Sequence, residues 1–165
     1  MKNKERQAHQ LRFSEGSYSR PIRSTKIRKT MITRKVRIHN WTILFLFSFD
    51  KYDVESIYDA LLWAEAPDSI ISQVSENVCA GRLNEGFCFS QSSARRSVAA
   101  VGMASNGPEV LNTTVHEIAH VAQHICGADG IDPMSEDVAY IIGDITIQIS
   151  DIVCQLSCPH CNRHD

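Results

Sequence analysis

The chain has 165 residues, of which 43% are hydrophobic and 22% are charged, values typical of one soluble globular domain and not of a disordered or fibrous chain. Its longest uninterrupted apolar runs, residues 43–47 among them, are five residues long, whereas a membrane-spanning helix needs roughly 20. The net charge of −2 is unevenly distributed: residues 1–40 hold 12 Lys and Arg against 2 Asp and Glu, and the other 125 residues hold 5 against 17.

Residues 1–30 form a basic arm without apolar periodicity. Such a composition cannot offset the entropy of ordering, so we predict a disordered arm. Its charge leaves two interpretations open, a solvated tail or a nucleic-acid contact. No apolar stretch follows the first charged residues, so no secretory signal is predicted. We therefore expect a cytoplasmic protein with no membrane partner, whose six cysteines are thiols or metal ligands.

The first half of the predicted domain contains one strand and two helices. A strand is expected from Val36 onward, because residues 35–49, KVRIHNWTILFLFSF, are rich in the β-branched and aromatic residues of strands. Asp53 then precedes apolar residues at helical spacing. Pro67 ends that helix, and a second begins at Asp68 and ends at Gly81. The inward positions expected for the first helix are Val54, Ile57, Tyr58, Leu61 and Leu62.

The second half contains two strands and two helices. Residues 86–90 and 95–105 are the predicted strands, joined by a polar turn. A helix follows the turn at residues 106–108 and should end near Ile125, before Gly127. Ser135 precedes a last helix that keeps its apolar spacing to about Leu156. The order β-α-α-β-β-α-α predicts one α+β domain over residues 31–157, with a small, mainly antiparallel sheet and an antiparallel pair of final helices.

The sequence His116-Glu117-Ile118-Ala119-His120 carries the predicted chemistry. Residues four apart on a helix lie on one face, one turn apart, so both imidazoles can reach one ion. Glu117 sits beside that face, where its carboxylate can reach a metal-bound water without being a ligand. The pattern therefore predicts a zinc site with His116 and His120 as ligands.

A catalytic zinc usually has three protein ligands. His124 lies eight residues after His116, about 12 Å along a straight helix, which is too far for one ion. Glu136, at the start of the last helix, is the better candidate. Asp137 is the neighbouring alternative, although it points about 100° away. Tyr140, one turn after Glu136, supports the site or belongs to the core.

These residues resemble a known family. HEIAH followed by a helix with an early Glu is similar to the gluzincin branch of zincin metallopeptidases, and residues 110–145 also resemble small zincin-like proteins of bacteriophages and prophages. The resemblance implies a mini-zincin fold with Zn²⁺ at His116, His120 and Glu136, and Glu117 as general base. The chain lacks a separate substrate domain of the kind that larger gluzincins carry.

The C-terminal tail, residues 158–165, is rich in Cys and His. Together with the end of the last helix, it places Cys154, Cys158, Cys161 and His164 at metal-like spacing. A second, structural zinc and a thiol-rich tail are both open interpretations.

The sequence thus predicts a zinc-dependent peptidase acting on a peptide or protein substrate. The strand over residues 95–105, just before the HEIAH helix, is the expected sheet edge along which that peptide aligns. Two alternatives remain: a non-catalytic, zinc-stabilised binding module, and a nucleic-acid-associated protein that uses the basic arm.

Overall fold

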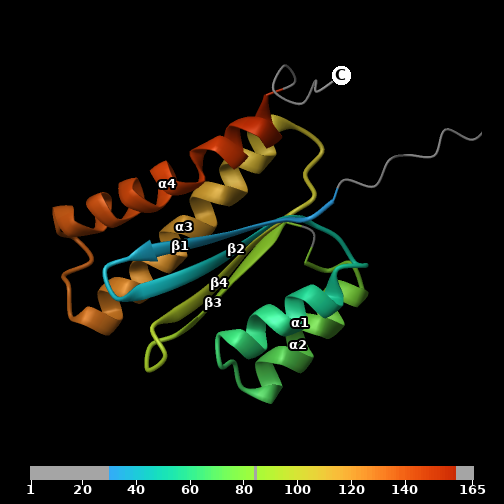
Figure 1. The fold of residues 1–165 in the computed structure, drawn as a ribbon, viewed down its shortest axis with the longest axis horizontal. Helices are drawn as coiled ribbons and strands as arrows, with labels where there is room; N and C mark the ends of the chain where they lie inside the picture. The colour runs from blue at the N-terminus through green and yellow to red at the C-terminus, as the bar shows by residue number, and fades with distance from the viewer. Residues whose placement is uncertain (1–29, 84, 159–165) are drawn as a thin grey trace, which may run out of the picture.

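A computed structural model describes residues 30–83 and 85–158 (Figure 1). In this part of the chain the order of elements is ββααββαα, which confirms the α+β prediction. The strands are β1 (Ile32–Ile38), β2 (Trp41–Phe49), β3 (Gly86–Gln91) and β4 (Arg96–Gly102), and the helices are α1 (Val54–Trp63), α2 (Asp68–Cys79), α3 (Gly107–Asp129) and α4 (Glu136–Ser157).

The four strands form one mixed sheet in the order β1-β2-β4-β3. β1 and β2 are antiparallel, β2 and β4 are parallel, and β4 and β3 are antiparallel. The sheet is therefore mainly antiparallel, as predicted. However, β4 lies in its interior, so the prediction that residues 95–105 form the edge was wrong. β4 pairs with β2 on one side and with β3 on the other, so β3 is the strand at the edge of the sheet.

The single strand expected from Val36 is instead two strands. Residues 32–38 pair with residues 41–47 across a tight turn, in which His39 has a φ of 50°. The continuous β-like composition concealed this turn, because His39-Asn40 carries no Gly or Pro signal. A left-handed conformation at a residue such as His39 is uncommon but tolerated in turns.

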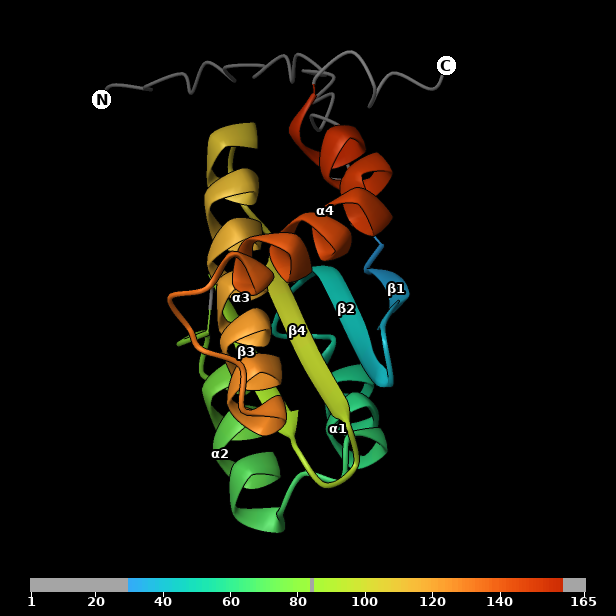
Figure 2. The same cartoon turned by 90° about the vertical axis from the view of Figure 1, so that its left-hand side faces the viewer.

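Helices cover both faces of the sheet (Figures 1 and 2). α3 and α4 pack on one face, around a core that includes Trp41, Phe45 and Ile118. α1 and α2 lie on the other face, where Ile57 and Leu61 are buried. Tyr58 and Leu62 were predicted to face inward but are about half exposed, because α1 buries only the narrower stripe of its apolar residues.

Both long helices have recognisable ends. The side chain of Asn106 accepts a hydrogen bond from the Glu109 N–H at 3.0 Å, which caps the start of α3. Gly127 does not end this helix, contrary to the prediction. α3 continues to Asp129 and ends at Gly130, whose φ of 68° suits a glycine. Ser135 is the N-cap residue of α4, as expected.

Two sequence predictions fall mostly outside the described residues. The basic arm is one, since only Thr30 of it is described, and the metal-like spacing of the tail is the other, since Cys161 and His164 lie beyond Cys158. Within residues 30–83 and 85–158, no helix has the length and apolar character needed to cross a membrane.

Two glycines provide a test of the packing between α3 and the sheet. A Cβ at Gly86 would lie 2.6 Å from the Ala100 carbonyl oxygen and 2.8 Å from Glu117 Oε1, whereas a Cβ at Gly143, on α4, meets nothing within 4 Å. Gly86→Ala should therefore lower the free energy of unfolding by about 1–3 kcal/mol, as overpacking does. The control Gly143→Ala should raise it by about 0.5–1 kcal/mol. Urea denaturation measures both, and equal effects would contradict the close packing at Gly86.

Candidate functional site

His116 and His120 are brought together on one face of α3. Their Nε2 atoms lie 3.0 Å apart, and the rings meet edge to face with centroids 4.5 Å apart. Two nitrogens bound to one tetrahedral zinc, each at about 2.0–2.1 Å, lie about 3.3 Å from one another. The pair thus nearly has the spacing of two zinc ligands. The same distance also allows a direct hydrogen bond between two neutral imidazoles.

Glu117 is buried between α3 and β3. Its side chain is only 4% exposed, and its Oε1 lies beside Gly86, the strand residue without a side chain. Its other oxygen, Oε2, is buried without a hydrogen-bond partner among the described residues. An unpartnered buried carboxylate oxygen is costly in a folded protein and calls for a ligand, a water or a proton.

The electrostatics of Glu117 follow from this burial. Desolvation raises the pKa of Glu117 above its ordinary value, and the neighbouring His116 acts in the opposite direction. A carboxylate whose pKa is raised accepts protons more readily near neutral pH, which suits a general base. The orphaned oxygen and the two converging imidazoles fit a zinc ion with an associated water.

Glu136 does not join this pair. Among the residues that the structure describes, no three His, Cys, Asp or Glu side chains come together as a metal site. The reason is the length of α3, which continues nine residues past His120 to Asp129, or about 13 Å at 1.5 Å per residue. Glu136 follows only after that end, so its carboxylate lies far along the helix from His120. The predicted three-ligand set is therefore not assembled.

Tyr140 is 66% exposed on α4. The interpretation of this residue as part of the core was therefore wrong. The exposed position arises because α4 buries a different stripe of residues against α3 and the sheet, among them Ile141, Ile145 and Ile149.

Sequence reasoning missed the contribution of β3. Ser90 Oγ lies 2.8 Å from His124 Nδ1, and Cys88 Sγ lies 3.8 Å from the same nitrogen. Burial raises the pKa of Cys88 to about 12, with the Glu117 carboxylate adding to the shift, so without a metal this residue is a thiol near neutral pH. The alternation of Gly86, Cys88 and Ser90 with two phenylalanines was the available signal.

β3 also exposes backbone groups beside the site. The Gly102 N–H donates to the Glu85 carbonyl oxygen at 2.7 Å, and the register along β3 is regular. The alternation of an antiparallel ladder then directs the N–H and C=O groups of residues 86, 88 and 90 away from β4. These groups form an open edge alongside the histidine face of α3.

The opposite edge of the sheet is partly covered. Gln148 of α4 donates to the Arg37 carbonyl oxygen at 3.1 Å and accepts from the Arg37 N–H at 3.4 Å. The Arg34–Asp151 ion pair joins the same two elements at 2.6 Å. Covering an edge in this way prevents further strand pairing. The edge at β1 is therefore less available to an added strand than the edge at β3.

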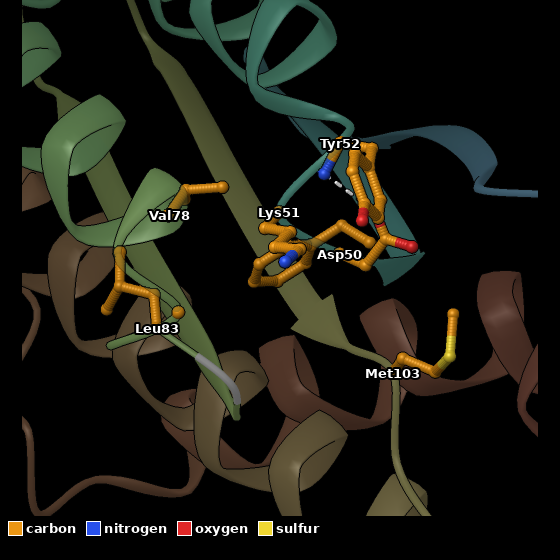
Figure 3. A pocket seen from close by; sticks show the side chains of 8 residues that line it. Asp50, Lys51, Tyr52, Val78, Leu83 and Met103 are labelled. Atoms are coloured by element: carbon orange, nitrogen blue, oxygen red, sulfur yellow. Dashed lines mark hydrogen bonds between the residues drawn. The ribbon is translucent and has the colours of Figure 1, made fainter.

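Two hollows lie at the ends of the strands. One, of about 360 Å³, is lined by residues that include Glu85, Glu109 and Thr113. The side chain of Thr113, like the carboxylate of Glu117, lies directly beside Gly86. This hollow adjoins the site. The other, of about 350 Å³, is shown in Figure 3 and lies between Tyr52, Lys51 and Leu83. It contains none of the predicted site residues.

Comparison with models of known protein families found no match. Searches of curated proteins and of solved structures also found no similar chain. The likeness to gluzincins therefore rests on the sequence of the HEIAH helix alone, because the structure does not bring Glu136 to the two histidines.

The geometry predicts how metal binding responds to substitution. His116→Ala and His120→Ala should each lose zinc, because each removes one of two converging nitrogens. Glu136→Gln should keep it, because that carboxylate lies beyond the far end of α3. Zinc content per mole after dialysis, measured by mass spectrometry, checks all three. Loss of zinc from Glu136→Gln alone would show that α4 moves to complete the site.

Proposed function

We propose that this protein is a zinc-dependent peptidase with its reaction centre at His116, Glu117 and His120. The observation that carries the proposal is the orphaned oxygen of buried Glu117, on the residue that follows His116, whose Nε2 lies 3.0 Å from that of His120. A purely structural metal site has no use for an additional buried carboxylate that is not a ligand. A hydrolytic site requires one as a base.

His116 and His120 would hold the ion through Nε2. Zinc held there would act as a Lewis acid toward the substrate carbonyl and would lower the pKa of water. Glu117 would accept the proton of the attacking water at Oε2 and return it to the nitrogen of the leaving amine. Burial favours the first of these steps, because a desolvated carboxylate accepts a proton more readily than an exposed one does.

The substrate we propose is a peptide segment in extended conformation. The backbone groups of residues 86, 88 and 90 face outward from β3, so a peptide can add to the sheet there by strand pairing. Gly86 lies beside Glu117, so a peptide paired at that point would pass close to the carboxylate. β3, and not residues 95–105, is therefore the strand along which we propose that the peptide aligns.

The alternatives draw on different residues. A zinc-stabilised binding module would need His116 and His120 but not Glu117, and a nucleic-acid partner would need the basic arm. Within the described residues, the feature that distinguishes these alternatives is Glu117, and its burial favours hydrolysis.

Replacing Glu117 separates these possibilities. Glu117→Gln keeps the shape of the side chain but cannot accept the proton, so hydrolysis of a mixed peptide library should fall about 10²–10⁴-fold while zinc content is retained. Liquid chromatography with mass spectrometry of the products measures the rate.

The matched control is Glu76→Gln, the same substitution on α2, across the sheet from the site, and it should leave the rate unchanged. Zinc loss in Glu117→Gln would make Glu117 a ligand. Equal rates in Glu117→Gln and wild type, or no turnover in either, would favour the binding module.

A further inference from the structure

A chain of three hydrogen bonds links the interior of the sheet to His124. The Trp41 indole Nε1–H donates to Ser97 Oγ at 2.8 Å. Ser97 Oγ lies 2.7 Å from Ser90 Oγ, and Ser90 Oγ lies 2.8 Å from His124 Nδ1. Trp41 and Ser97 are fully buried, whereas the His124 ring is at the surface. The proposed zinc chemistry uses none of these four side chains.

The direction of these hydrogen bonds is set at the buried end. An indole N–H can only donate, so Ser97 Oγ is an acceptor there and must direct its own proton elsewhere. In the described part of the chain, its one other side-chain partner is Ser90. Ser90 thus accepts from Ser97 and donates to His124 Nδ1, which lies at 2.8 Å and is a better acceptor than the nearby Cys88 sulfur. The reverse order would leave the Ser97 hydroxyl proton buried without an acceptor, which costs about 1–3 kcal/mol.

This direction fixes the tautomer of His124. Since Nδ1 accepts a hydrogen bond, the proton of the neutral ring is on Nε2. A histidine that binds zinc through Nε2 instead carries its proton on Nδ1 and donates it to a neighbouring acceptor. The three histidines along α3 are therefore not equivalent: His116 and His120 face one another, and His124 is arranged as a donor.

We propose that His124 binds the peptide substrate, with its Nε2–H donating to a backbone carbonyl oxygen of a chain lying along β3. The inference rests on the proposed function. His124 contacts β3 at Ser90, and Glu117 contacts it at Gly86, four residues earlier. At about 3.3 Å per residue, these points are roughly 13 Å apart. His124 therefore holds the substrate about four residues from the bond that is cleaved, and Ser90 and Ser97 are positioning residues.

The tautomer can be read without turnover. Long-range ¹H–¹⁵N NMR spectra of ¹⁵N-histidine-labelled protein should show His124 with an unprotonated Nδ1 and a protonated Nε2, both before and after one equivalent of Zn²⁺ is added. A proton on Nδ1, or a zinc-induced change of tautomer, would overturn the inference.

Kinetics with the peptide library test the contact itself. His124→Ala should raise KM about tenfold with kcat little changed, as expected for one uniform hydrogen bond lost from ground and transition states. Ser90→Ala should also raise KM. Ser90→Thr, which retains a hydroxyl, should have a KM close to that of wild type. Gln123→Ala, an exposed neighbour on α3, is the control and should match wild type.

The outcomes distinguish this inference from the proposed function. Turnover by wild type with unchanged KM in His124→Ala refutes the inference alone. Loss of kcat and zinc together in His124→Ala would make His124 a ligand and refute it as well. Absence of turnover in wild type refutes the proposed function, and with it the substrate role of His124.

Discussion

The close approach of α3 to the edge strand β3 is the constraint on which the rest of the site depends. Gly86 permits it, because any side chain there would collide with the Ala100 carbonyl and with the Glu117 carboxylate. This contact buries Glu117 between helix and strand. It also leaves His116 and His120 on the outer part of the helix and aligns the open backbone groups of β3 with the histidine face. One glycine thus fixes the relation among the Glu117 carboxylate, the two imidazoles and the edge of the sheet.

A buried carboxylate with an unsatisfied oxygen works against the stability of the fold. Such costs persist mainly where the group has a function, and perturbed titration behaviour concentrates at reaction centres. The rest of the domain is ordinary by comparison. Its core is apolar, the start of α3 is capped by Asn106, and its other edge is covered by Gln148. The buried carboxylate oxygen without a partner lies where the sequence carries its metal-like motif, and this coincidence supports a chemical role for Glu117.

The sequence predicted local features well and long-range relations poorly. Helical periodicity identified the four helices of residues 30–83 and 85–158. The spacing of His116 and His120 was sufficient to place both rings on one face, because an α-helix has a fixed geometry. The turn at His39 was missed, since its neighbours are mostly β-like.

Glu136 was misplaced because the sequence motif does not indicate where α3 ends. The six residues from Gly130 to Ser135 reverse the chain only after the helix has passed well beyond His120. The positions of Gly86 and Ser90 beside α3 depend on strand order, which local patterns do not encode.

The most direct test of this account is where zinc binds. Crystals of the zinc-loaded protein, measured on both sides of the zinc absorption edge, give an anomalous difference map that locates the ion independently of any activity. The account predicts one strong peak within bonding distance of His116 Nε2 and His120 Nε2, with the Glu117 carboxylate facing it without being a ligand. A fully loaded crystal without density between the two imidazoles, or with zinc bound directly by Glu117, would contradict the claim that this helix carries a hydrolytic metal centre.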